Sequence, residues 1–463
     1  MKYINEDKLF GLLSGAKEPD KEKIEKIFSK AKSLQRLSLE ETASLLAIEN
    51  PGYLSKLFET AAFVKNSIYG KRIVLFAPLY ISNFCANDCL YCAFKSGNRL
   101  TKRRALSPEG IKSQTEWLLS RGHKRILMVS GESGSTGKAN IDFYIDSVRA
   151  IYSAKIGKNK IKRVNVNCAP LLVEEFKKLK SSGIGTYQLF QETYHETTYR
   201  HVHPKGPKSD PDNRIDAIDR AFLAGIDDLG IGVLYGLYDW KFETLAMLTH
   251  IEHLEKKFNV GPHTISVPRI EPALGVDFID DMPHKISDQD FKKLVAVLRI
   301  SVPYTGIILS TRETADLRDE LFNLGVSQIS AESRTSPGGY SSDDNNQNTD
   351  IQFTLGDQRS LDEVLGSLIK HGFIPSFCAA CYRKERTGEA FMNLAKPGTI
   401  KGKCSMNALI TLKEYLDDFA STEVKKEGYN LIDNFKNTLD KDSLILLTRF
   451  FEDIDKGIRD EYV

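Results

Sequence analysis

Short apolar runs alternate with longer amphipathic stretches along this chain from about residue 72 onward. Near-continuous apolar runs are typical of strands buried on both faces of a parallel sheet, whereas the stretches between them have the spacing of helices. Gly122, Gly183 and Gly225 each follow a predicted helix, where glycine suits the position just after the helix end. Strands are therefore predicted near residues 72–81, 125–132, 161–168, 186–192, 229–236, 264–270, 306–311 and 326–331, with helices between them that include 107–119, 173–180, 212–223 and 288–298.

Eight predicted strands that alternate with helices indicate an α/β fold with a parallel sheet. Eight is the number that closes a (β/α)8 TIM-type barrel, and an open doubly wound sheet is the alternative. In such barrels the active site forms at the C-terminal ends of the strands. The predicted strand ends are therefore the place where we expect the chemistry.

The regions on either side of the predicted barrel differ from it. Helices are predicted over the first 65 or so residues, where Ser38 and Glu41 form an S-x-x-E capping box and Pro51 opens a further helix. A polar loop over residues 336–350 is expected to lie outside the core, and two terminal helices are predicted near the C-terminus. We therefore predict an N-terminal helical extension over residues 1–68, the barrel over 69–375 and a C-terminal cluster-binding extension over 376–463.

Composition and charge exclude several classes of protein. The 463 residues include 64 Lys and Arg against 62 Asp and Glu, a net charge of +2, which argues against a nucleic-acid-binding protein or a polybasic membrane-surface protein. Apolar residues make up 41% of the chain, enough for a sizeable core, yet no apolar run approaches the roughly 20 residues of a membrane helix. The first 25 residues carry charges throughout and have no signal-peptide core, so a cytoplasmic location is expected.

Seven cysteines fall into two groups of three and one single residue. The odd number, in a large chain with no predicted signal peptide, disfavours a disulfide framework and favours metal sites. The first triplet, Cys85, Cys89 and Cys92, has the spacing C-x3-C-x2-C directly after the first predicted strand. Three thiolates from one short loop can hold three irons of a 4Fe–4S cubane and leave the fourth iron open to a small molecule, whereas a closed zinc site usually needs four protein ligands.

This loop resembles that of the radical S-adenosylmethionine (SAM) superfamily. The resemblance implies a 4Fe–4S cluster whose open iron binds the amino and carboxylate groups of SAM, with Tyr91 as a further cofactor contact. Residues 130–134, with the sequence Ser-Gly-Glu-Ser-Gly, are similar to the glycine-and-glutamate element of the superfamily. The glycine-rich turn with Gly131 offers bare backbone N–H groups, and Glu132 offers an acceptor for the methionine ammonium of SAM; a merely structural turn is the alternative.

The second triplet, Cys378, Cys381 and Cys404, has the spacing C-x2-C-x22-C. Three thiolates again suggest a cluster with an open corner, and zinc with His371 as a fourth ligand is the alternative. Together with the first loop, this triplet resembles the HydG family, the radical SAM tyrosine lyases of FeFe-hydrogenase maturation. The resemblance extends from about residue 70 to the C-terminus and is carried by residues 185–195, 230–240, 261–269, 378–383, 386–388 and 391–392.

The resemblance implies a function. Enzymes of this family use SAM-derived radical chemistry to cleave L-tyrosine into p-cresol and dehydroglycine, and they convert dehydroglycine into CO and cyanide on an auxiliary 4Fe–4S cluster. That cluster can carry an extra iron with free cysteine, and the iron carbonyl–cyanide unit is passed on for assembly of the H-cluster. Expected partners are therefore L-tyrosine, a reductant such as ferredoxin or flavodoxin, and other hydrogenase maturation proteins, with no nucleic acid and no membrane.

The same resemblance implies roles for individual residues. The first triplet would hold the SAM-binding cluster, the second triplet the auxiliary cluster, and His263 the extra iron. Gln191 and Glu192, at a predicted strand end, are candidate catalytic residues over SAM and the tyrosine amine; a polar strand-end cluster is the alternative. Arg269 is a further candidate for the SAM side. Cys168 belongs to neither triplet and is expected to be a small apolar core residue.

The tyrosine carboxylate needs a cationic partner, and Arg312 at the end of the seventh predicted strand is the candidate. A guanidinium suits a bidentate pair with a carboxylate. The alternative for Arg312 is an ion pair with Glu313 at the mouth of the barrel. Ser330, at the end of the eighth strand, could add a hydroxyl to the same carboxylate.

Two other functions are kept as alternatives. The related tyrosine lyase of thiamine biosynthesis stops at dehydroglycine and lacks the second triplet. A non-catalytic iron–sulfur carrier or scaffold would need cysteines, but it would need neither an eight-stranded barrel nor the Gly131–Glu132 element. The second triplet disfavours the first alternative, and the barrel disfavours the second.

Overall fold

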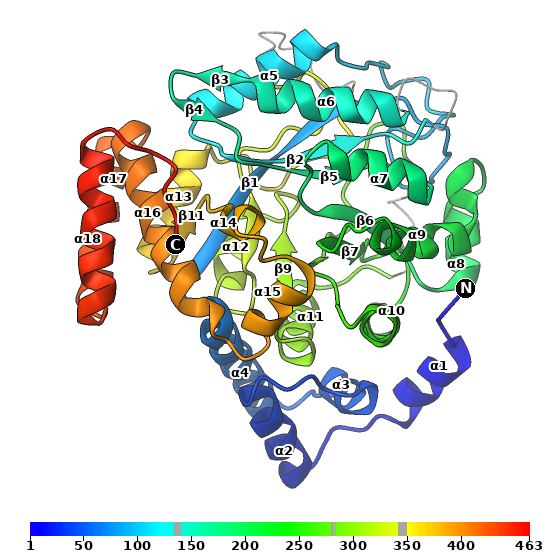
Figure 1. Cartoon of the computed structure of the whole chain (residues 1–463). Coiled ribbons are helices and arrows are strands. Elements are labelled where there is room, and N and C mark those ends of the chain that lie inside the picture. Colours follow the sequence, from blue (N-terminus) through cyan, green and yellow to red (C-terminus); the bar gives the residue numbers. More distant parts are fainter. Residues whose placement is uncertain (134–139, 279–281, 283, 341–349) are drawn as a thin grey trace.

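Parallel strands close into a barrel at the centre of the molecule, and helices surround them (Figure 1). The computed structural model describes residues 1–463 except 134–139, 279–281, 283 and 341–349. Among the described residues, eight strands follow one another around the barrel, and the last pairs with the first. They are β1 (Arg72–Ser82), β2 (Arg125–Ser130), β5 (Arg163–Asn167), β6 (Tyr187–Glu192), β7 (Leu229–Val233), β8 (Thr264–Ser266), β9 (Gly306–Leu309) and β10 (Gln328–Ser330). The predicted (β/α)8 barrel is confirmed.

The long strand β1 joins three neighbours along its length. Its second half pairs with β2 from Ala77 onward, and its middle pairs with β10, where Val74 lies opposite Gln328. Its first residues pair with a further strand, β11 (Ile374–Ser376), so the chain after the barrel returns to the barrel sheet. This pairing brings the segment that follows β11 to the N-terminal end of the barrel.

Helices cover the outside of the barrel and connect its strands. Each of the four predicted inter-strand helices is present, with ends that differ by no more than a few residues from the prediction. Gly122, Gly183 and Gly225 have φ angles of 95°, 83° and 84°, the left-handed conformation expected just after a helix. The covering elements are α5 (Pro108–Ser120), α6 (Ile141–Ser153), the hairpin of β3 (Lys155–Ile156) and β4 (Asn159–Lys160), α7 (Val173–Ser181), α8 (Glu196–Val202), η1 (Pro207–Ser209), α9 (Pro211–Leu223), α10 (Trp240–Phe258), α11 (Asp288–Ser301), α12 (Ala315–Leu321) and α13 (Leu361–Lys370).

The N-terminal region is helical, as predicted. Ser38 and Glu41 form a reciprocal capping box at the start of α3, and Pro51 is the first residue of α4. Helix α4 packs against α11 of the barrel and against α16 of the C-terminal region. These N-terminal helices are α1 (Glu6–Gly15), α2 (Lys21–Lys32), α3 (Leu39–Leu46) and α4 (Pro51–Tyr69).

The two terminal helices predicted in the C-terminal region are present, but three further helices precede them. The structure has α14 (Ala380–Arg383), α15 (Gly388–Ala395), α16 (Ile400–Asp418), α17 (Thr422–Lys436) and α18 (Lys441–Asp455). Helix α16 packs against β11, α4, α17 and α18, so consecutive residues from Met406 to Ile410 are buried. A helix that is covered on most sides lacks the single apolar stripe on which helix prediction depends.

The prediction that the polar loop lies outside the core is wrong for its described ends. Ser336, Tyr340 and Asp350 are all buried, and the Tyr340 hydroxyl donates a hydrogen bond to the carbonyl of Pro78, at 2.6 Å. Residues 341–349 lie outside the described part of the chain. The low-complexity composition of the loop concealed two buried ends, one of which is bonded to β1 through Tyr340.

One hydrophobic core runs through the N-terminal helices, the barrel and the C-terminal helices, from Ile4 to Ile454. The predicted boundary after residue 375 falls within β11. The division into three domains stays a prediction. In the described residues, no helix is both long enough and apolar enough to cross a membrane.

Candidate active site and second cysteine site

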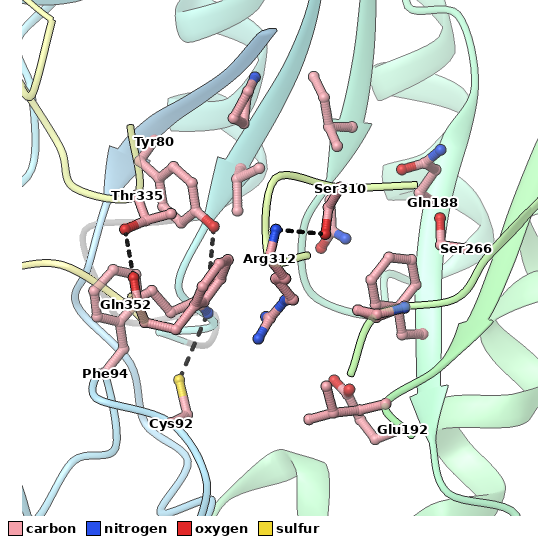
Figure 2. A pocket seen from close by; sticks show the side chains of 18 of the residues that line it. Tyr80, Cys92, Phe94, Gln188, Glu192, Ser266, Ser310, Arg312, Thr335 and Gln352 are labelled. Atoms are coloured by element: carbon pink, nitrogen blue, oxygen red, sulfur yellow. Dashed lines mark hydrogen bonds between the residues drawn. The ribbon is translucent and has the colours of Figure 1, made fainter. Parts of the chain in front are cut away.

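A cavity of about 190 Å³ opens at the C-terminal ends of the barrel strands (Figure 2). Side chains alternate between the two faces of a strand, so every second residue of a barrel strand faces inward. Phe76, Pro78 and Tyr80 of β1 line this cavity, as do Gln188 and Phe190 of β6. The first triplet lies at its mouth, as predicted for a site at the strand ends.

All three cysteines of the first triplet line this one cavity and are free thiols. Their loop is held by hydrogen bonds that do not depend on a metal. The guanidinium of Arg103 donates to the carbonyls of Asn83, Phe94 and Lys95, at 2.7, 2.8 and 2.6 Å. Contacts within the protein therefore help to fix the shape of this loop.

The electrostatics of these thiols fit a site that is filled by a cation. Burial raises the pKa of Cys85 to about 11, and the carboxylate of Glu132 adds to the rise. Burial also raises the pKa of Cys89 and of Cys92. A metal that binds here must displace protons from the thiols, and its positive charge must then replace the missing solvation.

The positions of the possible metal ligands give no support to a zinc site at the second triplet. Among the described side chains, no three Cys, His, Asp or Glu residues converge as the ligands of one metal ion. A cubane takes its three thiolates at three different irons, so its cysteines need not converge on a point. His371, the proposed fourth zinc ligand, receives no support, because its Nδ1 lies 2.8 Å from the carbonyl of Ser367 and its side chain does not line the second cavity described below.

The Gly131–Glu132 turn is tied directly to the cysteine loop. The Gly131 N–H donates to the carbonyl of Ser82, and the Ala86 N–H donates to the carbonyl of Glu132, each at 2.8 Å. A Cβ atom at Gly131 would lie 2.4 Å from the carbonyl oxygen of Phe84, so only glycine fits. Glycine is therefore required at this position because two backbone segments pack closely there. The prediction gave another reason, the bare N–H groups of the turn. Gly134, the last residue of the predicted element, lies outside the described residues.

Glu132 enters the cavity as a carboxylate. Its Oε2 accepts from the side-chain amide of Asn87 and its Oε1 from Arg214 Nη1, each at 2.9 Å. Burial opposes ionisation, but the charges of Arg214 and Lys208 outweigh it and lower the pKa of Glu132. An ionised carboxylate that faces the cavity can accept a hydrogen bond from an ammonium group.

Of the two candidate catalytic residues at the end of β6, only Glu192 lines the cavity. Its carboxylate accepts from Lys208 Nζ at 2.5 Å and lies 3.7 Å from Arg214 Nη2. The Gln191 side chain points to the other face of the strand, where its Nε2 donates to the carbonyl of Pro211 at 3.2 Å. Gln191 is therefore not placed over a ligand in the cavity, because strand alternation turns it away.

Sequence reasoning missed several polar residues of this cavity, among them Gln188, Lys208 and Arg214. Gln188 could have been found, because it precedes inward-facing Phe190 by two positions on the same strand. Lys208 and Arg214 come from η1 and α9, and nothing in the local pattern marks them. They balance the charges of Glu132 and Glu192 across the cavity.

Arg312 faces the cavity without a carboxylate partner. Its guanidinium lies 3.3 Å from the ring centroid of Phe353, and its Nη1 donates to the carbonyl of Arg269 at 3.4 Å. The alternative of an ion pair with Glu313 is not found, because Glu313 pairs with Arg269. In the part of the chain that the structure describes, no ion pair engages Arg312, so its charge is available to an anionic ligand.

The remaining strand-end candidates have different surroundings. Ser330 lines the cavity, and its hydroxyl accepts from the Thr311 N–H at 3.1 Å. Tyr91 also lines the cavity, with its hydroxyl 2.8 Å from His203 Nε2. Arg269 does not line it, because its guanidinium binds Glu313 and also Asp288, at 2.8 Å.

A second, smaller cavity of about 40 Å³ lies at the opposite end of the barrel, and it brings the second triplet together with His263. Burial raises the pKa of Cys381 to about 12 and also raises that of Cys404. Burial lowers the pKa of His263, which favours the neutral imidazole that can bind a metal. The Nδ1 atom of His263 lies 3.9 Å from Asp228 Oδ2.

Arginine side chains line the second cavity beside the thiols. Burial opposes the charge of Arg72, but the negative charge that Cys404 and Cys378 carry as thiolates outweighs burial and raises the pKa of Arg72. Arg125 Nη1 donates to the carbonyl of Cys378 at 2.5 Å. Fixed cations at this position suit an assembly of thiolates and other anions.

The two cavities are lined by the same strands. On β1, Val74 lines the second cavity and Phe76 lines the first. On β10, Gln328 lines the second cavity and Ser330 lines the first. Both cavities therefore lie on the inside of one barrel, two residues apart along a strand. Cys168 lines neither of them and lies buried in the hydrophobic core.

The chain is similar to known proteins. The family profile described as the Radical SAM superfamily matches residues 79–249, and that of the Biotin and Thiamin Synthesis associated domain matches residues 266–374. The 2-iminoacetate synthase of Escherichia coli (strain K12) is 31% identical over 348 residues, which cover 75% of this chain and 88% of the relative.

A crystal structure of HydG, a maturase of the FeFe-hydrogenase, aligns over 100% of both chains with 46% sequence identity and a TM-score of 0.95. This chain belongs to the HydG family. The structure of the FeFe-hydrogenase maturase HydG from Carboxydothermus hydrogenoformans is 42% identical, with a TM-score of 0.84 over 96% of this chain and 97% of that one. As a HydG-family protein, the chain is a radical SAM enzyme, for which a 4Fe–4S cluster and SAM are the expected cofactors.

Proposed function

We propose that this HydG-family protein cleaves L-tyrosine to p-cresol and dehydroglycine in the first cavity and converts dehydroglycine to CO and cyanide at the second triplet. The observation that carries the proposal is the presence of two three-cysteine cavities at opposite ends of one barrel. The relative from Escherichia coli supports the first reaction, since its name, 2-iminoacetate synthase, describes formation of the compound also called dehydroglycine.

The residues of the first cavity divide between cofactor and substrate. The first triplet would hold the cluster, and Glu132 would accept a hydrogen bond from the SAM ammonium. When bound, the cluster and SAM supply a hydrogen-abstracting 5′-deoxyadenosyl radical. Arg312 and Ser330 would bind the tyrosine carboxylate, and Glu192 lies across the cavity, where it can accept a hydrogen bond from the substrate amine. Enclosure by the barrel excludes water from the reacting carbon atoms.

The second cavity would complete the reaction. The second triplet would hold an auxiliary 4Fe–4S cluster, and His263 would bind an extra iron together with free cysteine. The product, an iron carbonyl–cyanide unit for the H-cluster, would then pass to other hydrogenase maturation proteins. A ferredoxin or a flavodoxin is the reductant we expect.

An anaerobic assay tests the proposal. The reconstituted protein, supplied with tyrosine, SAM and dithionite, should release 5′-deoxyadenosine, p-cresol, CO and cyanide. Formation of p-cresol without CO or cyanide would favour the thiamine-type tyrosine lyase. If SAM does not change the EPR spectrum of the reduced cluster and no p-cresol forms at full cluster loading, the scaffold function is correct and the proposal fails.

Replacement of Arg312 by methionine should lower kcat/KM for tyrosine about 100-fold, with most of the change in KM. The substitution removes a cation that has no ion pair among the described residues, and loss of a charged hydrogen-bonding partner costs up to about 3 kcal/mol. Steady-state p-cresol formation measures the effect. Arg149→Met is the matched control, because Arg149 is an exposed arginine that pairs with Asp146, and this variant should match the wild type. An unchanged KM in Arg312→Met would place the carboxylate elsewhere.

A further inference from the structure

A side-chain amide donates a hydrogen bond to one sulfur of the first triplet. The Nε2 atom of Gln352 lies 3.6 Å from Cys92 Sγ, within the range of hydrogen bonds to sulfur. The other end of the same amide is occupied, since the Tyr80 hydroxyl donates to Gln352 Oε1 at 2.7 Å. Figure 2 shows Tyr80, Gln352 and Cys92 connected in this order at one side of the cavity.

The surroundings hold the amide of Gln352 in this orientation. Its backbone N–H donates to the carbonyl of Thr335 at 3.0 Å, and the Thr335 hydroxyl donates to the carbonyl of Phe353, also at 3.0 Å. Burial raises the pKa of Tyr80, so its hydroxyl keeps the proton that it donates. A flipped amide would place the carbonyl oxygen of Gln352 against a thiolate sulfur, and two negatively charged atoms would repel each other.

Cys92 has a side-chain hydrogen-bond donor, Gln352, in addition to its backbone surroundings. Burial raises the pKa of Cys85 and of Cys92, and backbone groups limit that rise: those of Asn87 and Glu132 for Cys85, and that of Phe94 for Cys92. Gln352 adds a side-chain donor to Cys92. Such a donor can be removed by mutation without changing the backbone that shapes the loop, so its effect on a cluster can be measured separately.

We propose that Gln352, oriented by Tyr80, raises the reduction potential of the SAM-binding cluster through its hydrogen bond to Cys92. Reduction adds an electron to the cluster and its thiolates, and a donor to sulfur stabilises that added negative charge more than it stabilises the oxidised form. The donor therefore makes the cluster easier to reduce before SAM is cleaved. The inference rests on a cluster at the first triplet and not on the identity of the substrate; the second cluster enters only as the internal control of the test.

Redox titration of the reconstituted holoenzyme, followed by EPR without SAM and without tyrosine, tests the proposal. The SAM-binding cluster is identified as the signal that changes when SAM is then added. In Gln352→Met, which keeps the length of the side chain and loses the donor, the ratio of reduced to oxidised cluster at a fixed potential should fall several-fold. A tenfold fall would correspond to 59 mV for a one-electron couple. Gln352→Leu should shift the ratio in the same direction, and Tyr80→Phe should do so to a smaller extent.

The second cluster in the same molecules serves as the control, and its ratio should not change. Iron and sulfide contents equal to those of the wild type will show that Gln352→Met and Gln352→Leu bind their clusters fully. An unchanged ratio at the SAM-binding cluster in both Gln352 variants overturns the proposal, and so does an equal shift at both clusters, which would indicate a general structural change. Because substrate is absent, failure of tyrosine cleavage would leave this result intact, and the two proposals fail independently.

Discussion

Replacement of Cys89 by alanine will abolish reductive cleavage of SAM, with 5′-deoxyadenosine formation reduced by at least about 1,000-fold. Cys89 is the most buried thiol of the first triplet, at 5% exposure, and water cannot easily take its place as a ligand. A cluster with three protein ligands loses one of them, and residues that act as a unit lose most of their effect when one member is removed. The amount of 5′-deoxyadenosine, determined by chromatography after anaerobic incubation with dithionite, measures the outcome.

Cys168→Ala is the matched control for this experiment. Cys168 is also a buried cysteine, but it lies in the hydrophobic core and lines neither cavity. Its replacement should change stability modestly, by about 1 kcal/mol, and leave SAM cleavage near the wild-type rate. Wild-type 5′-deoxyadenosine formation by Cys89→Ala would show that the first triplet does not hold the SAM-binding cluster.

The double variant Cys378→Ala with Cys381→Ala should separate the two halves of the reaction. We expect p-cresol formation to stay within about threefold of the wild type, and CO and cyanide to fall to background. The reason is spatial, because the second triplet lines a cavity at the other end of the barrel and shares no lining residue with the first. Chromatography of p-cresol and infrared detection of CO, carried out on the same reaction, measure both products.

His371→Ala provides the comparison for the second triplet. If zinc were bound by this triplet and His371, the His371 variant would lose metal together with the cysteine variant. The structure places His371 outside the second cavity, so the variant should keep both products. Loss of p-cresol and CO in equal measure in the cysteine variant, with the first cluster fully loaded, would contradict the division of the reaction between two sites.

The barrel could be predicted well because its signals are local. A strand buried on both faces needs a run of apolar residues, and a helix that returns the chain needs an amphipathic stretch and a glycine after its end. Both requirements act within a few residues of one another. The predicted strand near 72–81 is found at Arg72–Ser82 and the predicted helix over 288–298 at Asp288–Ser301, and Gly122 has the expected left-handed conformation.

The errors have a common cause, which is that burial depends on distant neighbours. Helix α16 lacks a clear apolar stripe because helices from both ends of the chain cover it. Gln191 and Gln188 lie on the same strand and have the same side chain, but only Gln188 faces the cavity. Tyr340 belongs to a loop of low complexity, yet it is buried, and its hydroxyl donates a hydrogen bond to the carbonyl of Pro78 on β1.

The sequence by itself determined the fold class, the two cysteine triplets and the family resemblance, because spacing along the chain carries all of these. Only the tertiary structure decided which candidates share a cavity. It brought His263 to the second triplet over more than a hundred residues and paired Arg269 with Glu313, so that Arg312 has no ion pair within the part of the chain that is described. It also placed Gln352 on Cys92. The physical reason is that a charge or a hydrogen-bond donor is satisfied by whatever the closed barrel places within about 3 Å of it, and that neighbour is set by the packing of the whole chain.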